Sequence, residues 1–113
     1  MIRNEQIAFI LGPYKAIQTE TKADTLCNIA LNIQAAKLVS IKYWKMGFAV
    51  ICPQMNSAML DDIINDDIWI NSYTEIMLRC DVVVMMKDWE IYVETVKLHA
   101  EAQIANKIIF YEY

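Results

Sequence analysis

Short apolar runs and helical spacings of apolar residues alternate along the chain. Largely apolar runs at residues 6–11, 48–52, 82–86 and 108–111 predict four β-strands, because runs of this length between turn residues are typical of buried strands. The run at residues 82–86 is too uniformly apolar for a half-exposed antiparallel strand. We therefore expect it to be covered on both faces.

Three helices are expected between these runs. The first is expected to begin after Asp24, its N-cap, and to continue to Met46, a length of about 33 Å at 1.5 Å per residue. Its evidence is the helical spacing of Leu26, Ile29, Ile33 and Ala36. Gly47 then supplies a positive φ at its end. Two further helices are expected at residues 67–79 and 93–105, and residues 53–66 are expected to form a polar connection.

The start of the second expected helix and the end of the third carry residues that are typical of helix ends. Asp66 and Asp67 match the positive N-terminal end of the second helix, and Asn106 is a left-handed stop for the third. Strands that alternate with helices predict right-handed crossovers and a parallel sheet in a single α/β domain spanning residues 1–113. Ligands of such sheets bind beyond the carboxyl ends of the strands, which here means a crevice bounded by residues 12–15, 53–57 and 87–92.

The chain resembles the nucleoside 2-deoxyribosyltransferase-like family, in particular its short, mostly uncharacterised members. The resemblance covers roughly residues 6–112 and depends on three blocks: Ile-Leu-Gly-Pro-Tyr at residues 10–14, Gly-Phe-Ala-Val-Ile-Cys-Pro-Gln-Met-Asn-Ser-Ala at residues 47–58, and Cys-Asp-Val-Val-Val-Met at residues 80–85 followed by Asp88, Trp89 and Glu90. It implies a flavodoxin-like three-layer α/β/α fold whose four-stranded parallel sheet has the order 2-1-3-4. It also implies a homo-oligomer with sites near the subunit interfaces.

The loop after the first strand is a candidate ligand loop. Gly12 permits close backbone approach, Pro13 stiffens the turn, and Tyr14 offers an aromatic face with a hydroxyl. The resemblance implies that this loop holds a nucleoside, whereas the residues alone fit an ordinary strand-to-helix turn equally well. Asn56 and Ser57, after the second strand, are candidates to bind a base or ribose, although both are also common turn residues.

The segment from Asp88 to Ala102 departs from the family pattern. Family members continue from the Trp through Ser-x-Gly-x-x-x-Glu, in which the glutamate is the nucleophile that attacks the anomeric carbon. Aligned from Trp89, these three positions are Tyr92, Glu94 and Leu98. Leucine cannot form a glycosyl ester, so the site is expected to be degenerate.

Several functional hypotheses follow. The first is a binder of a nucleoside, nucleotide or nucleotide-derived signal that acts as a sensor or sequestering protein, with Gly12, Pro13, Tyr14, Asn56, Ser57, Asp88, Trp89 and Tyr92 at the binding site. The second is an active N-glycosidase or deoxyribosyltransferase that cleaves the N-glycosidic bond. Its nucleophile would be Glu94 or Glu101, each about one helical turn from Leu98, although both fit solvated helix positions as well. The third is a noncatalytic interaction protein with Tyr92 filling the crevice.

Composition narrows the partners. The net charge of −4 and the isoelectric point near 4.8 do not fit a nucleic-acid polymer as ligand. The high hydrophobic share of 57% in only 113 residues indicates a homo-oligomer. No run approaches the ~20 apolar residues of a membrane span, and the first residues lack a signal-peptide layout, so we expect no membrane partner and a cytoplasmic location.

No cofactor or metal is expected. Gly12 stands without a phosphate-loop or dinucleotide fingerprint, so neither ATP hydrolysis nor NAD reduction is expected. Asp61, Asp62, Asp66 and Asp67 do not have the spacing of a calcium loop. Cys27, Cys52 and Cys80 are expected to be small buried residues, and His99, which has no neighbouring nucleophile, is expected on a helix surface or at an interface.

Overall fold

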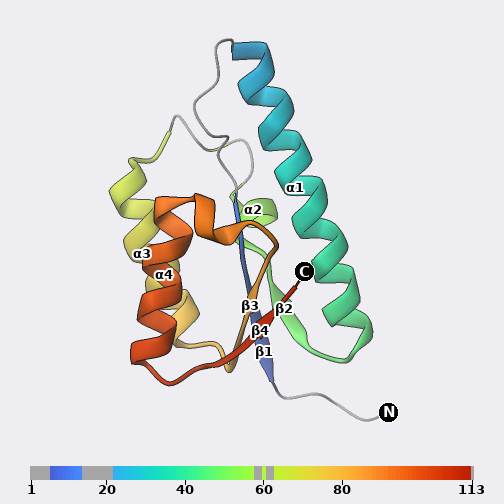
Figure 1. The fold of residues 1–113 in the computed structure, drawn as a ribbon, viewed down its shortest axis with the longest axis vertical. Coiled ribbons are helices and arrows are strands. Elements are labelled where there is room, and N and C mark those ends of the chain that lie inside the picture. The colour runs from blue at the N-terminus through green and yellow to red at the C-terminus, as the bar shows by residue number, and fades with distance from the viewer. Residues whose placement is uncertain (1–5, 14–21, 58–59, 61–62, 113) are drawn as a thin grey trace.

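The computed structural model describes residues 6–13, 22–57, 60 and 63–112, and of residues 22–25 it describes the backbone alone. One sheet runs through the molecule and helices cover both of its faces (Figure 1). The strands are β1 (Ile7–Leu11), β2 (Ala49–Ile51), β3 (Val82–Met85) and β4 (Ile108–Tyr111). The α-helices are α1 (Lys22–Lys45), α2 (Pro53–Asn56), α3 (Asp66–Leu78) and α4 (Val93–Ile104), and a 3-10 turn, η1 (Trp89–Ile91), precedes α4.

The sheet is parallel throughout and has the order β2-β1-β3-β4. Its register places Ala8 beside Val82 and Val82 beside Ile108. This order confirms the expected 2-1-3-4 arrangement of a flavodoxin-like α/β fold. The carboxyl ends of all four strands therefore lie at one edge of the sheet.

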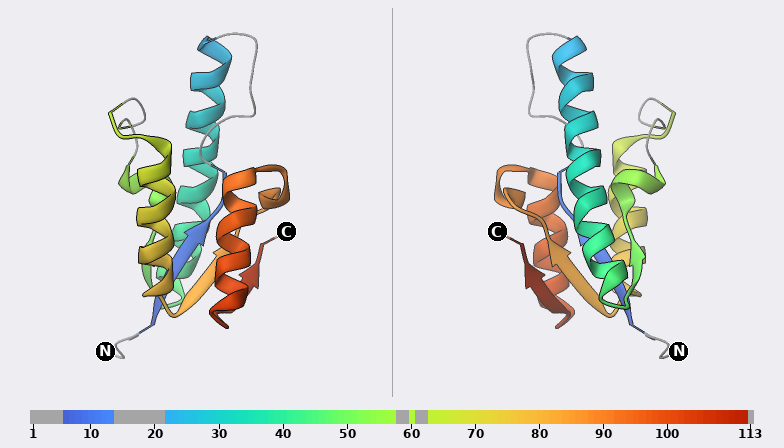
Figure 2. Two further views of the ribbon diagram at one scale, coloured as in Figure 1. Left: turned by 90° about the vertical axis from the view of Figure 1, so that its left-hand side faces the viewer. Right: turned by 90° about the vertical axis from the view of Figure 1, so that its right-hand side faces the viewer.

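The sheet is the middle of three layers. Helix α1 covers one face, and α3 and α4 cover the other (Figure 2). Side chains of β3 alternate between the two layers, with Val82 and Val84 against α1 and Val83 and Met85 on the opposite side. All four are at most 1% exposed, which confirms that this strand is covered on both faces.

Helix ends follow local sequence signals, with one correction at the start of α1. Gly47 has a φ of 100° and Asn106 a φ of 56°, as expected for the residues that end α1 and α4. Helix α1 begins at Lys22, so Asp24 lies inside the first turn and is not the N-cap. The N-cap of α3 is Asn65, whose side chain accepts a hydrogen bond of 2.8 Å from the Asp67 backbone N–H.

The connection after β2 was also predicted incompletely. Residues 53–66 were expected to be a polar connection, yet their first four residues form α2, with Pro53 at the start where its missing N–H costs nothing. This short helix lies at the carboxyl edge of the sheet, where it closes one side of the crevice.

The cysteines and the apolar stripe of α1 differ from expectation in part. Cys80 is buried and Cys52 half-buried, but Cys27 is exposed, so the expectation of three buried cysteines is wrong for Cys27. Leu26 is also exposed, because the N-terminal part of α1 extends past the strands and has no sheet beneath it (Figure 1).

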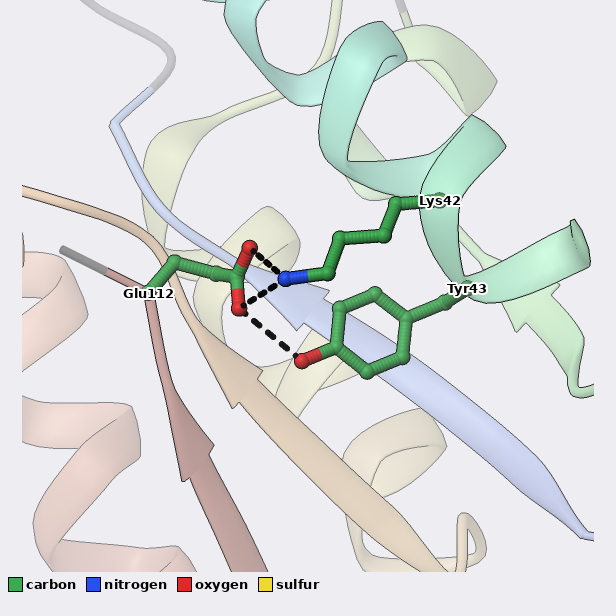
Figure 3. A network of polar contacts seen from close by, with 3 residues as sticks. All are labelled: Lys42, Tyr43 and Glu112. Atoms are coloured by element: carbon green, nitrogen blue, oxygen red, sulfur yellow. Dashed lines mark hydrogen bonds and ion pairs between the residues drawn. The ribbon is translucent and has the colours of Figure 1, made fainter. Parts of the chain in front are cut away.

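A polar network joins the end of β4 to α1. The carboxylate of Glu112 contacts the Lys42 Nζ at 2.9 Å and accepts a hydrogen bond of 3.0 Å from the Tyr43 hydroxyl (Figure 3). Burial, with the hydrogen bond and the charge of Glu112 adding to it, raises the pKa of Tyr43 to about 12. The network fixes the edge strand against the long helix.

Neither α1 nor any other helix in the described part of the chain combines the length and apolar character that a membrane crossing requires.

Candidate functional site

A cavity of about 150 Å³ lies at the carboxyl ends of β1 and β2, on the face of the sheet covered by α3 and α4. Its floor is the end of β1, and its walls are α2 and the first turns of α3 and α4. This is the crevice that the parallel topology predicts. The lining residues are Phe9, Ile10, Leu11, Gly12, Pro13, Pro53, Gln54, Ser57, Asp66, Trp69, Ile70, Tyr73, Tyr92, Glu94, Thr95 and Leu98.

Gly12 and Pro13 line the cavity as predicted from sequence. A side chain at Gly12 would collide with Met86, since a Cβ built there lies 2.7 Å from the Met86 Cβ and Cγ atoms. The absence of a side chain therefore serves packing within the chain as well as access to the cavity. Tyr14, the third residue of the predicted loop, lies outside the described residues.

Gln54 is a site residue that the sequence did not reveal. Its side chain is 2% exposed and its Nε2 donates a hydrogen bond of 3.1 Å to the Gly12 carbonyl oxygen. Its Oε1 lies 3.5 Å from the Cys52 Sγ, which donates to it. Gln54 thus ties the loop after β2 to the loop after β1 where both line the cavity.

Asn56 and Ser57 have separate places. Ser57 lines the cavity, where its hydroxyl donates to the Pro53 carbonyl oxygen at 3.0 Å and accepts from the Tyr73 hydroxyl at 2.9 Å. Asn56 is exposed and its Nδ2 donates to the same Tyr73 hydroxyl at 3.1 Å. Asn56 therefore supports Tyr73 from outside and does not line the cavity.

Aromatic rings form much of the wall. Trp69 and Tyr73 lie one helical turn apart on α3, with ring centroids 6.0 Å apart and planes at 16°. Phe9, on β1, packs edge to face against Tyr73 with ring centroids 6.3 Å apart. Tyr92 lines the cavity without filling it. Trp69 and Tyr73 were also missed from sequence, because their helical spacing alone does not distinguish a site wall from an ordinary core.

The two candidate nucleophiles lie in different surroundings. Glu94, in the first turn of α4, lines the cavity together with Asp66 from the first turn of α3. Glu101 is exposed, as Glu94 also is, but it is absent from the lining. Leu98, in the second turn of the same helix as both glutamates, is 5% exposed and lines the cavity. Of the two glutamates, only Glu94 is in place to touch a ligand there.

Asp88 and Trp89 lie off the cavity. Asp88 is exposed and adopts a φ of 66° before the 3-10 turn. Trp89 packs its ring on the imidazole of His99, with centroids 4.1 Å apart, and neither residue belongs to the lining. The structure therefore does not bring these two predicted binding residues together with the rest of the site.

His99 was expected on a helix surface or at an interface, and the first of these is wrong because His99 is buried within the chain. It is 9% exposed, and its Nε2 lies 2.8 Å from the Tyr111 hydroxyl on β4. Burial lowers the pKa of His99, with a smaller opposing effect of Glu90. Trp89, His99 and Tyr111 form a packed aromatic cluster that holds α4 against the edge strand.

Within the described residues, no group of three or more histidine, cysteine, aspartate or glutamate side chains lies close enough together to hold a metal ion. Comparison with known proteins adds no assignment: no family model, curated protein or solved structure matches this chain.

Proposed function

We propose that the chain binds a nucleoside, nucleotide or nucleotide-derived signal in the cavity and leaves its N-glycosidic bond intact. The observation that carries the proposal is Leu98, which lines the cavity at the position where the resembling family has its nucleophilic glutamate. An aliphatic side chain there fits a degenerate nucleoside 2-deoxyribosyltransferase-like site. Such a protein would act as a sensor or would sequester its ligand.

The lining suits a planar ring. An apolar cavity of about 150 Å³ is large enough to take up benzene, so this cavity has room for one ring of a base while the sugar lies toward the mouth. Trp69 and Tyr73 offer stacking faces. Stacking of a base on an aromatic side chain contributes about 1 to 3 kcal/mol per base.

The first experiment incubates the protein with a panel of nucleosides, deoxynucleotides and ADP-ribose-type compounds, and follows bound ligand and free base by chromatography. We expect a retained, intact ligand. Trp69→Leu should weaken its binding about tenfold or more, while Trp44→Leu, a change at an exposed tryptophan on α1, should not. If no compound is retained and none is cleaved, the result instead favours a noncatalytic interaction protein.

The alternative is an N-glycosidase or deoxyribosyltransferase with Glu94 as nucleophile, because Glu94 lines the cavity. In that case free base appears in the same incubation, and Glu94→Gln abolishes its release. Glu101→Gln is the matched control, since Glu101 is on the same helix but outside the lining. Release that survives Glu94→Gln would exclude this mechanism.

A further inference from the structure

Helix α1 carries a regular stripe of residues on its outer side. The stripe repeats at alternating steps of four and three residues, which is the spacing of a coiled-coil seam, and consists of Cys27, Leu31, Gln34, Leu38, Ile41 and Lys45. Ala36 and Tyr43 lie on the opposite side of the helix and are buried against the sheet. These six residues, the outer stripe of α1, therefore point away from the sheet.

The apolar members of the outer stripe are open to solvent. Leu31, Leu38 and Ile41 are 61%, 59% and 38% exposed. Helix α1 forms the outer layer on its side of the sheet, where a second long helix has room to lie along it (Figure 2). A seam of this spacing is covered by a facing helix in a coiled coil, and no helix of the described part of the chain covers this one.

The outer stripe is complementary to itself when two copies of α1 run in opposite directions. A two-fold axis at the middle of the stripe places each apolar position against another stripe position of the second copy, as an interface between identical surfaces requires. The facing positions are Leu31 with Ile41, Gln34 with Leu38, and Cys27 with Lys45. Only the last pair includes a charge, and it lies at the end of the contact, where the ammonium reaches water.

The distribution of charge favours the antiparallel direction. Residues 26–36 contain no charged residue, whereas the last part of α1 carries Lys37, Lys42 and Lys45. In a parallel pair Lys45 would face Lys45 of the second copy inside the stripe, and Lys37 would flank Lys42 on both sides. In the antiparallel pair one such contact of like charges remains, between Lys37 and its own copy. The lysines of each helix then lie mainly beside the uncharged half of the other.

We infer that a second copy of this chain binds the outer stripe through its own α1, in an antiparallel two-fold dimer. The stripe is about 27 Å long and a helix is about 10 Å wide, so the contact covers on the order of 300 Å² of each copy. Stable interfaces cover about 800 Å² per partner, and this dimer is therefore weak and reversible. It forms on the face of the sheet opposite the cavity, whereas the family resemblance implies sites near the subunit interfaces. Dimer formation and nucleoside binding can therefore be tested separately.

Sedimentation velocity of the full chain at about 5 to 500 µM, a range suited to a small interface, measures the association. Leu31→Glu and Ile41→Lys, each alone, should raise the Kd of the dimer about tenfold or more, because each places charges among apolar side chains. The two changes together should restore association, because antiparallel pairing places the new carboxylate beside the new ammonium of the other copy. The matched control Ile104→Glu, at a residue 76% exposed on α4, should leave the Kd unchanged.

A cross-link tests the direction of the helices independently. In the antiparallel pair the thiol of Lys45→Cys lies beside Cys27 of the second copy, so diamide should give a covalent dimer whose disulfide joins positions 27 and 45 in mass spectrometry. Within one chain these positions are about 27 Å apart along the helix, too far for a disulfide.

A monomer at every concentration would overturn the inference and mean that another occupant covers the outer stripe. A dimer indifferent to Leu31→Glu, or a disulfide that joins position 45 to position 45, would also overturn it. None of these results changes the expected binding of nucleosides.

Discussion

Replacement of Gly12 by alanine tests how the floor of the cavity is built. A Cβ at this position lies 2.7 Å from the Met86 Cβ and Cγ atoms, and Met86 is 3% exposed at the end of β3. Contacts under 3.0 Å do not persist, so Met86 has to move within a packed core. The same shift disturbs Gln54, whose Nε2 lies 3.7 Å from the Met86 Sδ and 3.1 Å from the Gly12 carbonyl oxygen.

Overpacking of this kind costs about 1 to 3 kcal/mol. For a domain of this size a loss of 1 kcal/mol lowers the melting temperature by about 4 °C. We therefore expect Gly12→Ala to melt about 4 to 12 °C below the wild type in thermal unfolding followed by circular dichroism. Glycine in place of Met86, which removes the Cβ together with the rest of the side chain, should relieve the collision.

A double-mutant cycle with Met86→Gly isolates the contact, because glycine lacks the Cβ as well as the Cγ of Met86. Met86→Gly alone should cost at least the ~2 to 5 kcal/mol of a Met→Ala truncation through the cavity it leaves, and the double variant should be more stable than the sum of the two changes by about 1 kcal/mol or more. Gly47→Ala is the control, because its cost comes from a φ of 100° and should add to that of Met86→Gly. Additive costs for Gly12→Ala and Met86→Gly, or an unchanged melting temperature for Gly12→Ala, would refute the packing argument.

Three other predictions concern titration and association. Because the pKa of His99 is lowered in the fold, the unfolded chain takes up the proton first as the pH falls through 6.5, and acid destabilises the fold. His99→Phe should reduce the loss of unfolding free energy between pH 7 and 5 in denaturant titrations, and an equal loss in the variant and the wild type would contradict this. The pKa of Tyr43 of about 12 means that the free energy of unfolding falls between pH 10 and 12, because the tyrosine ionises first in the unfolded state. Glu112→Gln should lower this pKa in a titration of tyrosinate absorbance, where Tyr43→Phe identifies the signal of Tyr43, and an unchanged titration would rule out the contact. Sedimentation equilibrium should show the homo-oligomer expected from composition, and Leu38→Glu should weaken its association because Leu38 is 59% exposed on α1. A monomer at every protein concentration would refute the expected oligomer.

The sequence predicted the architecture well because each signal is local. Gly47 and Asn106 mark helix ends by their backbone preferences, and the unbroken apolar run of β3 reports burial on both faces. Strand order and the location of the crevice then follow from parallel topology and from the family resemblance. The resemblance itself stays a prediction.

The site was predicted less well because its walls come from distant parts of the chain. Trp69 and Tyr73 reach the cavity only because α3 begins at the carboxyl edge of the sheet. Gln54, and not Asn56, points inward because α2 forms a helical turn directly after β2. No local pattern in the sequence specifies which side chain of that turn faces the β1 loop.

His99 shows the same limit. Its position on α4 fits a helix surface when the helix is considered alone. It is buried because Trp89 and Tyr111, which lie ten and twelve residues away along the chain, meet over it. Such convergence of three segments appears only once the fold has placed the edge strand beside α4.

The most direct test of the account is titration calorimetry of the purified protein with the nucleoside and nucleotide panel, followed by chromatography of the contents of the cell. The account predicts a saturable heat with one site per chain, weakened in Trp69→Leu, and recovery of the ligand with its N-glycosidic bond intact. Free base in the recovered solution, or no binding heat with any compound of the panel, would contradict it.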